Sequence, residues 1–386
     1  MKISVAKSDL ETALKVAAIS VDSSVNDLSS HYLFRVTDTG AEVLSYGPRL
    51  FSRAPFTSSC DGEPGEAFTV EAWRLDKWMA GVADGVLELS FDGSGDVHAR
   101  GKRSKVRFRS LNPSKFPYWD GLMSEAADVG DVDPRVLSNA MKFARIFVSA
   151  DDTAKPELCQ LEGIEGSFWA TDRRGLANVE VRSLENLHVR IPGKDSAPLM
   201  KFLGDKDTMA NSVFLQKAER SAEDGGGAFA VFKRPDGSYL GVSRPTSNFP
   251  TLKVDRDSAP QTAMTLDVAE FDAGVAVLSA GAPKGHESVT FSYDQDSGVV
   301  SIAMPSEAGG QDEYPLSLAK VSEGGEKFDT AFTVDIKYVN EISSVLGLEV
   351  LNLGLVRKGR GGYVTCDHNE EAEDGNRYFG VIVWRT

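Results

Sequence analysis

Three pairs of amphipathic helical segments recur along the chain, and this repeat constrains the fold more than any other feature. The first helix of each pair is predicted to begin near residues 8, 133 and 267, and the second near residues 70, 196 and 335. Ser8 and Asp267 are predicted N-caps, the helix near 196 is predicted over 196–203, and residues 37–40 predict a turn between strands. The spacing of about 125–139 residues is too long for a solenoid repeat and suits copies of a whole domain. Each copy has the order strand, helix, strands, helix, strands, which is typical of an α+β domain with two helices on an antiparallel sheet. We therefore predict three tandem domains, at residues 1–124, 125–256 and 257–386.

The segment 133–151 shows the helical pattern most clearly. Asp133 is a favourable N-cap residue, and Pro134 suits the first helical position. An apolar stripe follows at helical spacing and comprises Leu137, Ala140, Met141, Ala144 and Phe147. The opposite side has three cations and no acid, and comprises Arg135, Ser138, Lys142, Arg145 and Ser149. A single helix of this kind is usually a surface helix packed on a sheet, but its recurrence in the other repeats favours a functional basic face.

Length and composition are typical of a globular protein. A chain of 386 residues exceeds one ordinary core, and 41% of its residues are hydrophobic. No apolar run approaches the roughly 20 residues that a membrane helix needs. Because the N-terminal segment lacks the apolar region of a signal peptide, we expect a cytoplasmic protein. The three cysteines, Cys60, Cys159 and Cys366, are far apart and are expected to be reduced thiols.

The net charge of −15 argues against indiscriminate coating of nucleic acid. It does not exclude a local basic surface, because only the face in contact sets the electrostatic interaction with phosphates.

Three segments are distinctive, namely GKRSKVRFRSLNPSKFPYWD (101–120), FWATDRRGLANVEV (168–181) and SNFPTLKV (247–254), and the most specific motif spans residues 170–177. In this order they resemble segments of the bacterial DNA sliding clamp, the processivity subunit of the replicative polymerase. The resemblance implies that three domains form half of a ring and that two chains join head to tail around duplex DNA. It further implies that the helices line the hole without base-specific contacts. The protein would be a divergent member of the family, cellular or viral, with no enzymatic activity, cofactor or metal ion.

Within that scheme, cations on or beside the predicted helices would face the DNA backbone across water. They are Lys7, Lys15, Arg74, Lys77, Arg135, Lys142, Arg145, Lys194 and Lys201. For any one of them, an ordinary solvated residue is the alternative explanation. The third repeat fits less well, because its first helix carries Glu270 and Asp272 and its second offers only Lys337.

Residues 102–109 form a basic, alternating segment that predicts a strand with Val106 and Phe108 on one side. An edge strand protected by charge against aggregation is one explanation. The resemblance implies instead one side of a subunit interface, formed by Arg103, Lys105, Val106, Arg107, Phe108 and Arg109. The other side would be the acidic Glu307, Asp312 and Glu313, just before a predicted strand at 314–318. Opposite charges at opposite ends of one chain favour head-to-tail pairing.

Sliding clamps bind a short peptide of polymerases and loaders between the second and third domains, and the resemblance implies such a site here. The matching positions are Leu161, Thr171, Arg173, Arg174, Leu176, Pro250, Val381, Ile382, Val383 and Trp384. Apolar walls, one large aromatic and a few donors suit a peptide, although a buried last strand would equally explain residues 381–384. The family usually has Gly-His-Arg where this chain has Arg173-Arg174-Gly175, and Met-Pro-Met where it has residues 382–384. We therefore expect a different peptide preference.

Other motifs have simpler explanations than chemistry. Residues 294–298 resemble the start of a calcium loop but lack the distal Glu, so a hairpin turn is favoured. The acidic segment 367–374 is expected to be a solvated loop. The glycine-rich segments 225–227 and 359–362 lack the context of a phosphate loop, and the histidines lack metal-ligand spacing. No Ser/His/Asp arrangement has supporting context, although residues distant in sequence could still form one.

We therefore predict a non-enzymatic clamp that encircles duplex DNA and tethers a DNA polymerase and a clamp loader, as a head-to-tail homodimer. The alternative is an acidic α+β scaffold or inhibitor that binds replication proteins without encircling DNA. A hydrolase with dispersed carboxylates ranks third. A clamp should be trapped on nicked circular DNA and released when the DNA is linearised. The scaffold and the hydrolase should not behave in this way, because surface binding depends on salt and not on whether the DNA is circular.

Overall fold

The protein is described by a computed structural model over residues 1–25, 27–117, 119–150, 155–181, 188–204, 212–219, 228–250, 260, 262–322, 331–358, 361–368 and 376–385. Its contacts divide it into two units. Unit 1 comprises Met1–Pro134 and Lys194–Pro245, and unit 2 comprises Arg135–Gly193 and Thr246–Thr386. Each unit therefore contains parts of two predicted repeats.

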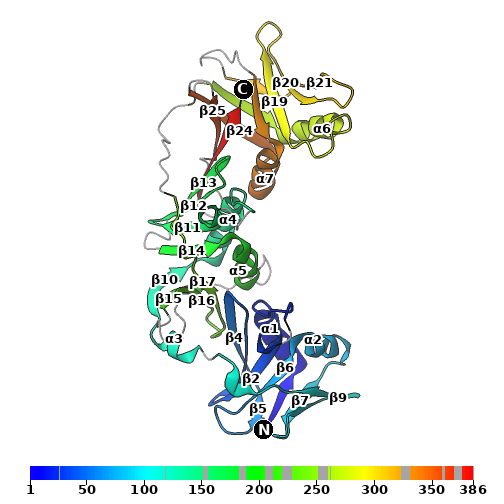
Figure 1. Ribbon diagram of the computed structural model, residues 1–386, viewed down its shortest axis with the longest axis vertical. Helices are drawn as coiled ribbons and strands as arrows, with labels where there is room; N and C mark the ends of the chain where they lie inside the picture. The colour runs from blue at the N-terminus through cyan, green and yellow to red at the C-terminus, as the bar shows by residue number, and fades with distance from the viewer. Residues whose placement is uncertain are drawn as a thin grey trace. The chain divides into compact units, whose positions relative to one another are not determined.

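Unit 1 contains two antiparallel sheets (Figure 1). The five-stranded sheet has the order β5-β1-β7-β8-β9, with β1 (Lys2–Ala6), β5 (Ser59–Asp61), β7 (Val86–Phe91), β8 (Asp96–Gly101) and β9 (Ser104–Arg109). The eight-stranded sheet has the order β10-β15-β16-β17-β4-β3-β2-β6. Its strands are β2 (His31–Thr37), β3 (Gly40–Tyr46), β4 (Leu50–Phe56), β6 (Ala67–Glu71), β10 (Ala127–Val132), β15 (Val213–Glu219), β16 (Ala228–Lys233) and β17 (Tyr239–Ser243). The pairing of β17 with β4 joins strands of two repeats in one sheet.

The helices of unit 1 are α1 (Lys7–Ala17), α2 (Ala72–Gly81), α3 (Asp120–Ser124) and α5 (Ser196–Leu203). Helix α1 packs on β3 and β4, and α5 packs on β17. The predicted bounds of α5 are confirmed, whereas the predicted cap of α1 at Ser8 is wrong. The N-cap residue is Ala6, and Ser8 lies inside the helix, because the chain turns into the helix directly from β1.

The segment that follows β9 packs against the eight-stranded sheet. Trp119 stacks on Phe51 of β4 with ring centroids 4.1 Å apart, and Phe116 packs against Leu33 and Leu44. The sequence patterns did not predict α3, whose five residues are too few for a helical period.

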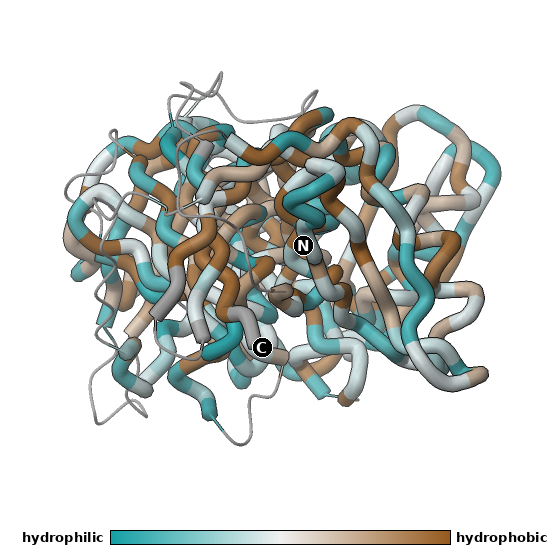
Figure 2. Tube along the Cα trace, turned by 90° about the horizontal axis from the view of Figure 1, so that it is seen from above, coloured by the Kyte–Doolittle hydropathy of each residue, from teal (hydrophilic) through white to brown (hydrophobic). Residues whose placement is uncertain are grey.

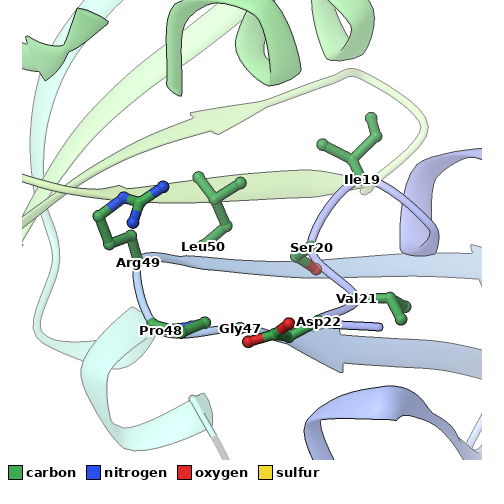
Figure 3. A pocket seen from close by; sticks show the side chains of 8 residues that line it. All are labelled: Ile19, Ser20, Val21, Asp22, Gly47, Pro48, Arg49 and Leu50. Carbon is green, nitrogen blue, oxygen red and sulfur yellow. The ribbon is translucent and has the colours of Figure 1, made fainter. Parts of the chain in front are cut away.

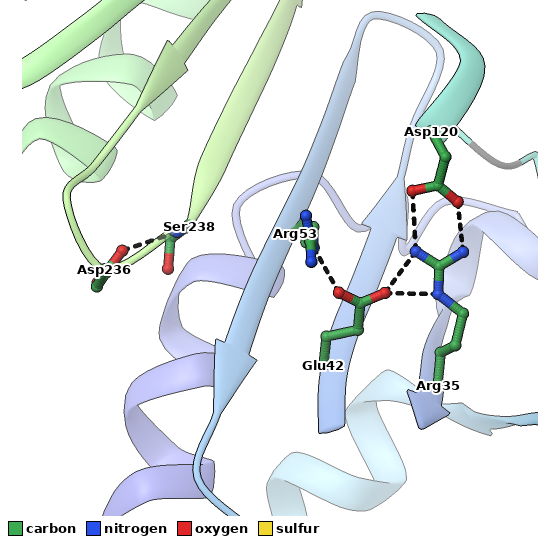
Figure 4. Close-up of polar contacts among 6 residues, drawn as sticks. All are labelled: Arg35, Glu42, Arg53, Asp120, Asp236 and Ser238. Carbon is green, nitrogen blue, oxygen red and sulfur yellow. Dashed lines mark hydrogen bonds and ion pairs between the residues drawn. The ribbon is translucent and has the colours of Figure 1, made fainter. Parts of the chain in front are cut away.

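A buried ionic cluster holds α3 to this sheet (Figure 4). The Glu42 carboxylate is fully buried and accepts from Arg35 Nε and Arg53 Nε, each at 2.5 Å. Arg35 also donates to both oxygens of Asp120, at 2.5 and 2.9 Å, and its guanidinium lowers the pKa of Asp120. Because a buried carboxylate is tolerated only when paired, Glu42 requires both arginines.

Unit 2 contains one thirteen-stranded sheet, whose main path is β14-β11-β12-β13-β26-β23-β19-β20-β21. These strands are β11 (Gln160–Ile164), β12 (Ser167–Thr171), β13 (Gly175–Glu180), β14 (His188–Pro192), β19 (Ser288–Asp294), β20 (Val299–Pro305), β21 (Gln311–Leu316), β23 (Phe332–Asp335) and β26 (Arg377–Arg385). Off this path lie β18 (Thr262–Asp267), β22 (Lys320–Val321), β24 (Val350–Lys358) and β25 (Gly361–His368). Here β13 pairs with β26, so the second and third repeats also share a sheet.

The helices of this part are α4 (Pro134–Arg145), α6 (Val268–Ser279) and α7 (Ile336–Leu346). The predicted cap of α6 is confirmed, because the Asp267 carboxylate accepts from the backbone N of Glu270 at 2.8 Å. Helix α4 ends earlier than the predicted 133–151, and Ser138 is buried instead of facing solvent. The segment before β26 covers this part of α4, since Asn376 donates to the backbone O of Val136.

Close packing holds α4 and α7 on the sheet. Phe147, just after α4, stacks on Tyr338 of α7 with ring centroids 5.2 Å apart. A Cβ atom added to Gly175 of β13 would lie 2.5 Å from Phe147, and one added to Gly380 of β26 would lie 3.3 Å from it. These two glycines let the aromatic ring approach the strands.

Several smaller expectations concern turns and surfaces. The turns at 37–40 and 294–298 join antiparallel strands as predicted, and the Asp294 carboxylate caps the second turn. Hydrophobic and hydrophilic stretches alternate along the elements in Figure 2, as expected where each element buries one face. Cys60, Cys159 and Cys366 form no disulfide with one another. Within the described ranges, no helix is long and apolar enough to cross a bilayer, and no group of three acidic, His or Cys side chains could hold a metal ion. Most of the acidic segment 367–374 lies outside the described residues.

Candidate functional site

Most of the cations predicted to face DNA lie on the solvent side of helices. Eight of the nine are exposed, namely Lys15, Arg74, Lys77, Arg135, Lys142, Arg145, Lys194 and Lys201. Lys7 is the exception, with a side chain only 14% exposed that pairs with Glu11 and Asp84. Desolvation lowers the pKa of Lys7, but the two carboxylates outweigh it, so the pKa is raised. Its charge is largely neutralised within unit 1.

Helix α2 presents an aromatic residue among its cations. Trp73 is 54% exposed and, like Lys77, lies opposite the buried Leu75 and Met79. The Arg74 guanidinium lies 5.3 Å from the Trp73 ring centroid. Sequence reasoning missed Trp73, although its position outside the apolar stripe was a visible signal.

The turn between β3 and β4 contacts the start of α5. Arg49 Nε lies 2.8 Å from Oδ2 of the buried Asp195, which follows Lys194. Beside this ion pair is a cavity of about 290 Å³, lined by Ile19, Ser20, Val21, Asp22, Gly47, Pro48, Arg49 and Leu50 (Figure 3). The sequence did not indicate this cavity. Of its polar lining residues, Ser20 has its hydroxyl hydrogen-bonded to those of Ser45 and Ser52, and Asp22 accepts from the backbone N and the hydroxyl of Ser24.

The predicted basic interface segment forms an edge strand. Among the described strands, β9 pairs with β8 alone. Phe108 is buried against Trp78 of α2, with ring centroids 6.3 Å apart, whereas Val106, predicted on the same side, is 36% exposed, so the predicted alternation is confirmed only in part. The outward or edge positions are exposed, namely Arg103, Lys105, Val106, Arg107 and Arg109. Arg107 pairs with Asp96 of β8 at 3.4 Å.

The predicted acidic segment lies at another sheet edge. Glu307, Asp312 and Glu313 are all exposed, and β21 pairs with β20 alone among the described strands. Asp312 and Glu313 lie within β21 and not before it, because the strand begins at Gln311. The expected strand at 314–318 was therefore placed too late.

The loop from Thr171 to Gly175 is held by a compact set of hydrogen bonds. Thr171 Oγ1 donates to the backbone O of Gly175 at 2.7 Å, and Asp172 Oδ1 accepts from the backbone N atoms of Arg174 and Gly175 at 2.9 Å each. The other Asp172 oxygen accepts from the Tyr338 hydroxyl of α7. Burial and this bond raise the pKa of Tyr338 well above its usual value. The loop is thus fixed to both the sheet and a helix.

Apolar residues lie beside this loop on one face of the sheet. Leu176 pairs with Val381, and the backbone N of Val383 donates to the backbone O of Arg174 at 2.7 Å. Because side chains alternate along strands, Leu176, Val381 and Val383 share the face opposite to that of Gly175 and Gly380. Val383 is 51% exposed, and Leu176 and Val381 are half-buried. We call these three residues the apolar patch.

The remaining predicted pocket residues are placed differently. Leu161 and Ile382 are fully buried, at 0% and 1% exposure, and Thr171 is buried at the loop. Pro250 is half-buried. The side chain of Trp384 lies outside the described part of the chain. The structure thus brings Arg173, Arg174 and the apolar patch together at the surface.

Comparisons with known proteins identify the fold. No protein-family profile and no curated protein matches the chain. Solved structures match all of it: the DNA polymerase sliding clamp from Caulobacter crescentus at 19% identity (100% of both chains, TM-score 0.80) and that from Bacillus subtilis at 16% (100% and 99%, 0.79). A third is the DNA polymerase III beta subunit from Thermotoga maritima, at 16% identity (100% and 99%, TM-score 0.80).

These matches define the class: the chain has the three-domain α+β fold of DNA sliding clamps. Within that class it is similar to the beta subunit of bacterial DNA polymerase III, so the resemblance seen in the sequence is confirmed at the level of the fold. Identities of 12–19% mark the sequence as divergent.

Proposed function

We propose that this protein is a non-enzymatic DNA sliding clamp, which encircles duplex DNA and tethers a DNA polymerase. The full-length match to sliding clamps carries this proposal. A replication role also suits a cytoplasmic location. We keep 1–124, 125–256 and 257–386 as the three clamp domains.

The exposed helix cations support the DNA-binding part of the proposal. They would attract phosphates without reading bases, which is what sliding requires. The net charge of −15 leaves the rest of the surface repulsive to DNA. Binding at the helices is then favoured over coating of the outside.

The two edge strands support a head-to-tail dimer. The backbone groups of β9 and β21 that face outward could pair with each other between two chains, as strands do at any sheet edge. Arg107 and Arg109 would then oppose the acidic Asp312 and Glu313. Each ring would contain two such interfaces, and like-charged ends would not pair.

The fixed loop and the apolar patch support a partner site. We propose that a short peptide of a polymerase or clamp loader binds there, with Leu176, Val381 and Val383 as the apolar contact. A few oriented donors beside an apolar surface are typical of peptide recognition.

Topology provides the test of encirclement. The protein is assembled with nicked circular plasmid and passed through a gel-filtration column at a salt concentration that removes surface-bound protein. We expect it to remain with the circle and to be released when the plasmid is cut once. Retention on linear DNA, or release from the circle by salt alone, would favour the non-encircling scaffold instead.

A further inference from the structure

Arg173 has a backbone conformation that usually belongs to glycine. Its φ is +75°, and among the described residues other than glycine only Glu165 shares a positive φ. The hydrogen bonds of Thr171 and Asp172 fix the loop on both sides of Arg173, so its backbone cannot relax. Residues held in this region are concentrated at ligand-binding sites. The arginine side chain is therefore a candidate for a role that glycine could not fill.

The two arginines of this loop present positive charge to solvent. Arg173 and Arg174 are both exposed, and the Arg173 side chain is 59% exposed. Arg173 Nη2 lies 3.9 Å from the Glu157 carboxylate, which is the outer limit of an ion pair. Such a contact leaves most donors of the guanidinium available to another anion.

These cations lie next to the apolar patch. The Val383 backbone is hydrogen-bonded to that of Arg174, and Leu176 lies two residues after Arg174, on β13. A ligand at this surface would meet apolar side chains and guanidinium groups side by side. Arginine binds carboxylates in bidentate geometry, so the pattern is complementary to an acidic group beside an apolar one.

We propose that this site selects a peptide with a carboxylate next to its apolar anchor, and that Arg173 and Arg174 read the carboxylate. The inference rests on the proposed partner site and names the chemistry of its ligand. The carboxylate belongs either to an Asp or Glu side chain or to the end of the peptide chain. Glu157 competes for Arg173 and weakens the selection.

Fluorescence anisotropy with matched peptides tests the selection. The probe Ac-Gly-Asp-Leu-Leu-Gly-NH2 carries one side-chain carboxylate, its Asn counterpart carries none, and the Asn peptide with a free C-terminus carries a terminal one. We expect a carboxylate probe to bind about 5-fold tighter than the neutral probe at low salt, with the difference shrinking as salt is raised. The carboxylate probe that binds more tightly shows whether the site prefers a side-chain or a terminal carboxylate.

Variants of the full-length protein assign the effect to the arginines. Arg173→Gly with Arg174→Gln should bind all three probes with equal affinity, whereas Arg173→Lys should keep part of the preference. Glu157→Gln should increase the preference, because it removes the competing carboxylate. Lys233→Gln, an exposed change of one charge on β16, is the control and should behave as the unmodified protein. Thermal unfolding checks that each variant is folded.

Three results would overturn the inference: no binding of any probe, equal affinities for the neutral and acidic probes, or an unchanged preference in the double variant. Displacement of the acidic probe by a single-stranded oligonucleotide that itself loses affinity in the double variant would assign the arginines to DNA and also overturn it. Retention on nicked circular plasmid is measured in parallel. If it persists while the peptide test fails, the clamp function stands and only the peptide selection is wrong.

Discussion

The first and third repeats share a fold but carry opposite charges at an outer strand of their sheets and on their first helices. In the first repeat, the basic β9 is an edge strand of the five-stranded sheet. In the third repeat, the acidic β21 is the strand at the end of the main path of its sheet. Helices α1 and α2 expose Lys15, Arg74 and Lys77, whereas α6 has no Lys or Arg and exposes Asp272. The fold therefore does not set the charge pattern. What each surface contacts is a better explanation.

The acidic Glu270 of α6 illustrates a structural use of charge. Its carboxylate accepts from the backbone N of Ser317 at 2.7 Å, the Ser317 hydroxyl at 2.6 Å and the backbone N of Leu318 at 2.9 Å. It fixes the turn that follows β21. From the sequence alone, Glu270 counts against a DNA-facing α6, but its carboxylate is engaged within the repeat. Asp272 is the acid on α6 that remains to be tested.

The largest expected effect is on the dimer. Replacing Arg107 and Arg109 by Glu makes the first-repeat edge acidic like β21, so the two edges would repel each other. We expect the dimer dissociation constant to rise by about 100-fold or more in sedimentation velocity experiments. Lys115→Glu with Lys233→Glu changes the net charge equally away from β9 and should leave the dimer intact. A double Arg variant with unchanged mass would exclude β9 from the interface.

The next effect concerns the first-repeat helices. Lys15→Glu with Lys77→Glu gives them the acidic character of α6 and should weaken binding to duplex DNA by about 10- to 100-fold at low salt. The slope of log affinity against log salt should fall by about 2 if both lysines face phosphates. Fluorescence anisotropy with a labelled duplex measures both quantities. The Lys115, Lys233 pair again serves as control, and an effect of equal size there would mean that net charge alone acts.

Two helix glycines, Gly274 inside α6 and Gly81 at the end of α2, differ in the space around them. A Cβ at Gly274 of α6 would lie 2.7 Å from Tyr314 and 2.9 Å from Ile302, whereas one at Gly81 of α2 meets nothing within 4 Å. Gly274→Ala should destabilise by about 1–2 kcal/mol, since crowding outweighs the gain in helix propensity. Gly81→Ala should be neutral or raise Tm. Calorimetry compares the unfolding temperatures of the two variants. A stabilised Gly274→Ala variant would show that Tyr314 and Ile302 can move to make room for the added methyl group.

The smallest effect sharpens the comparison at one residue. Asp272→Lys would give α6 the kind of cation that α1 and α2 have. If α6 faces DNA, affinity for a duplex should rise by about 3-fold, with Asp272→Asn giving part of the gain. Unchanged binding in both variants would place Asp272 away from the DNA.

Local patterns predicted the elements well, because their causes lie within a few residues. The cap at Asp267 and the turn at 294–298 follow from side chains next to the backbone groups that they bind, and α5 ends where Gly204 takes a φ of +101°. The alternation of β9 was visible only in part, because Phe108 is buried but Val106 is exposed.

Contacts between distant residues could not be predicted. Arg35 bridges the carboxylates of Glu42 and Asp120, and Arg49 forms an ion pair with Asp195, which lies 146 positions further along the sequence. Ser138 is buried because Asn376 returns to α4 from the far end of the chain. At the partner site, the motif at 170–177 located the loop. The positive φ of Arg173 was not visible, since arginine is an unusual residue for that conformation.

The hydrogen bonds between β4 and β17 have a consequence for anyone who wishes to divide this protein. A gene fragment that stops near residue 124 would leave β4 with a bare edge in the middle of what should be a continuous sheet. One that starts near 257 would do the same to β26, which loses β13. The three repeats therefore cannot be separated without breaking a sheet. A shortened version of the protein should retain both the β4–β17 and the β13–β26 pairings.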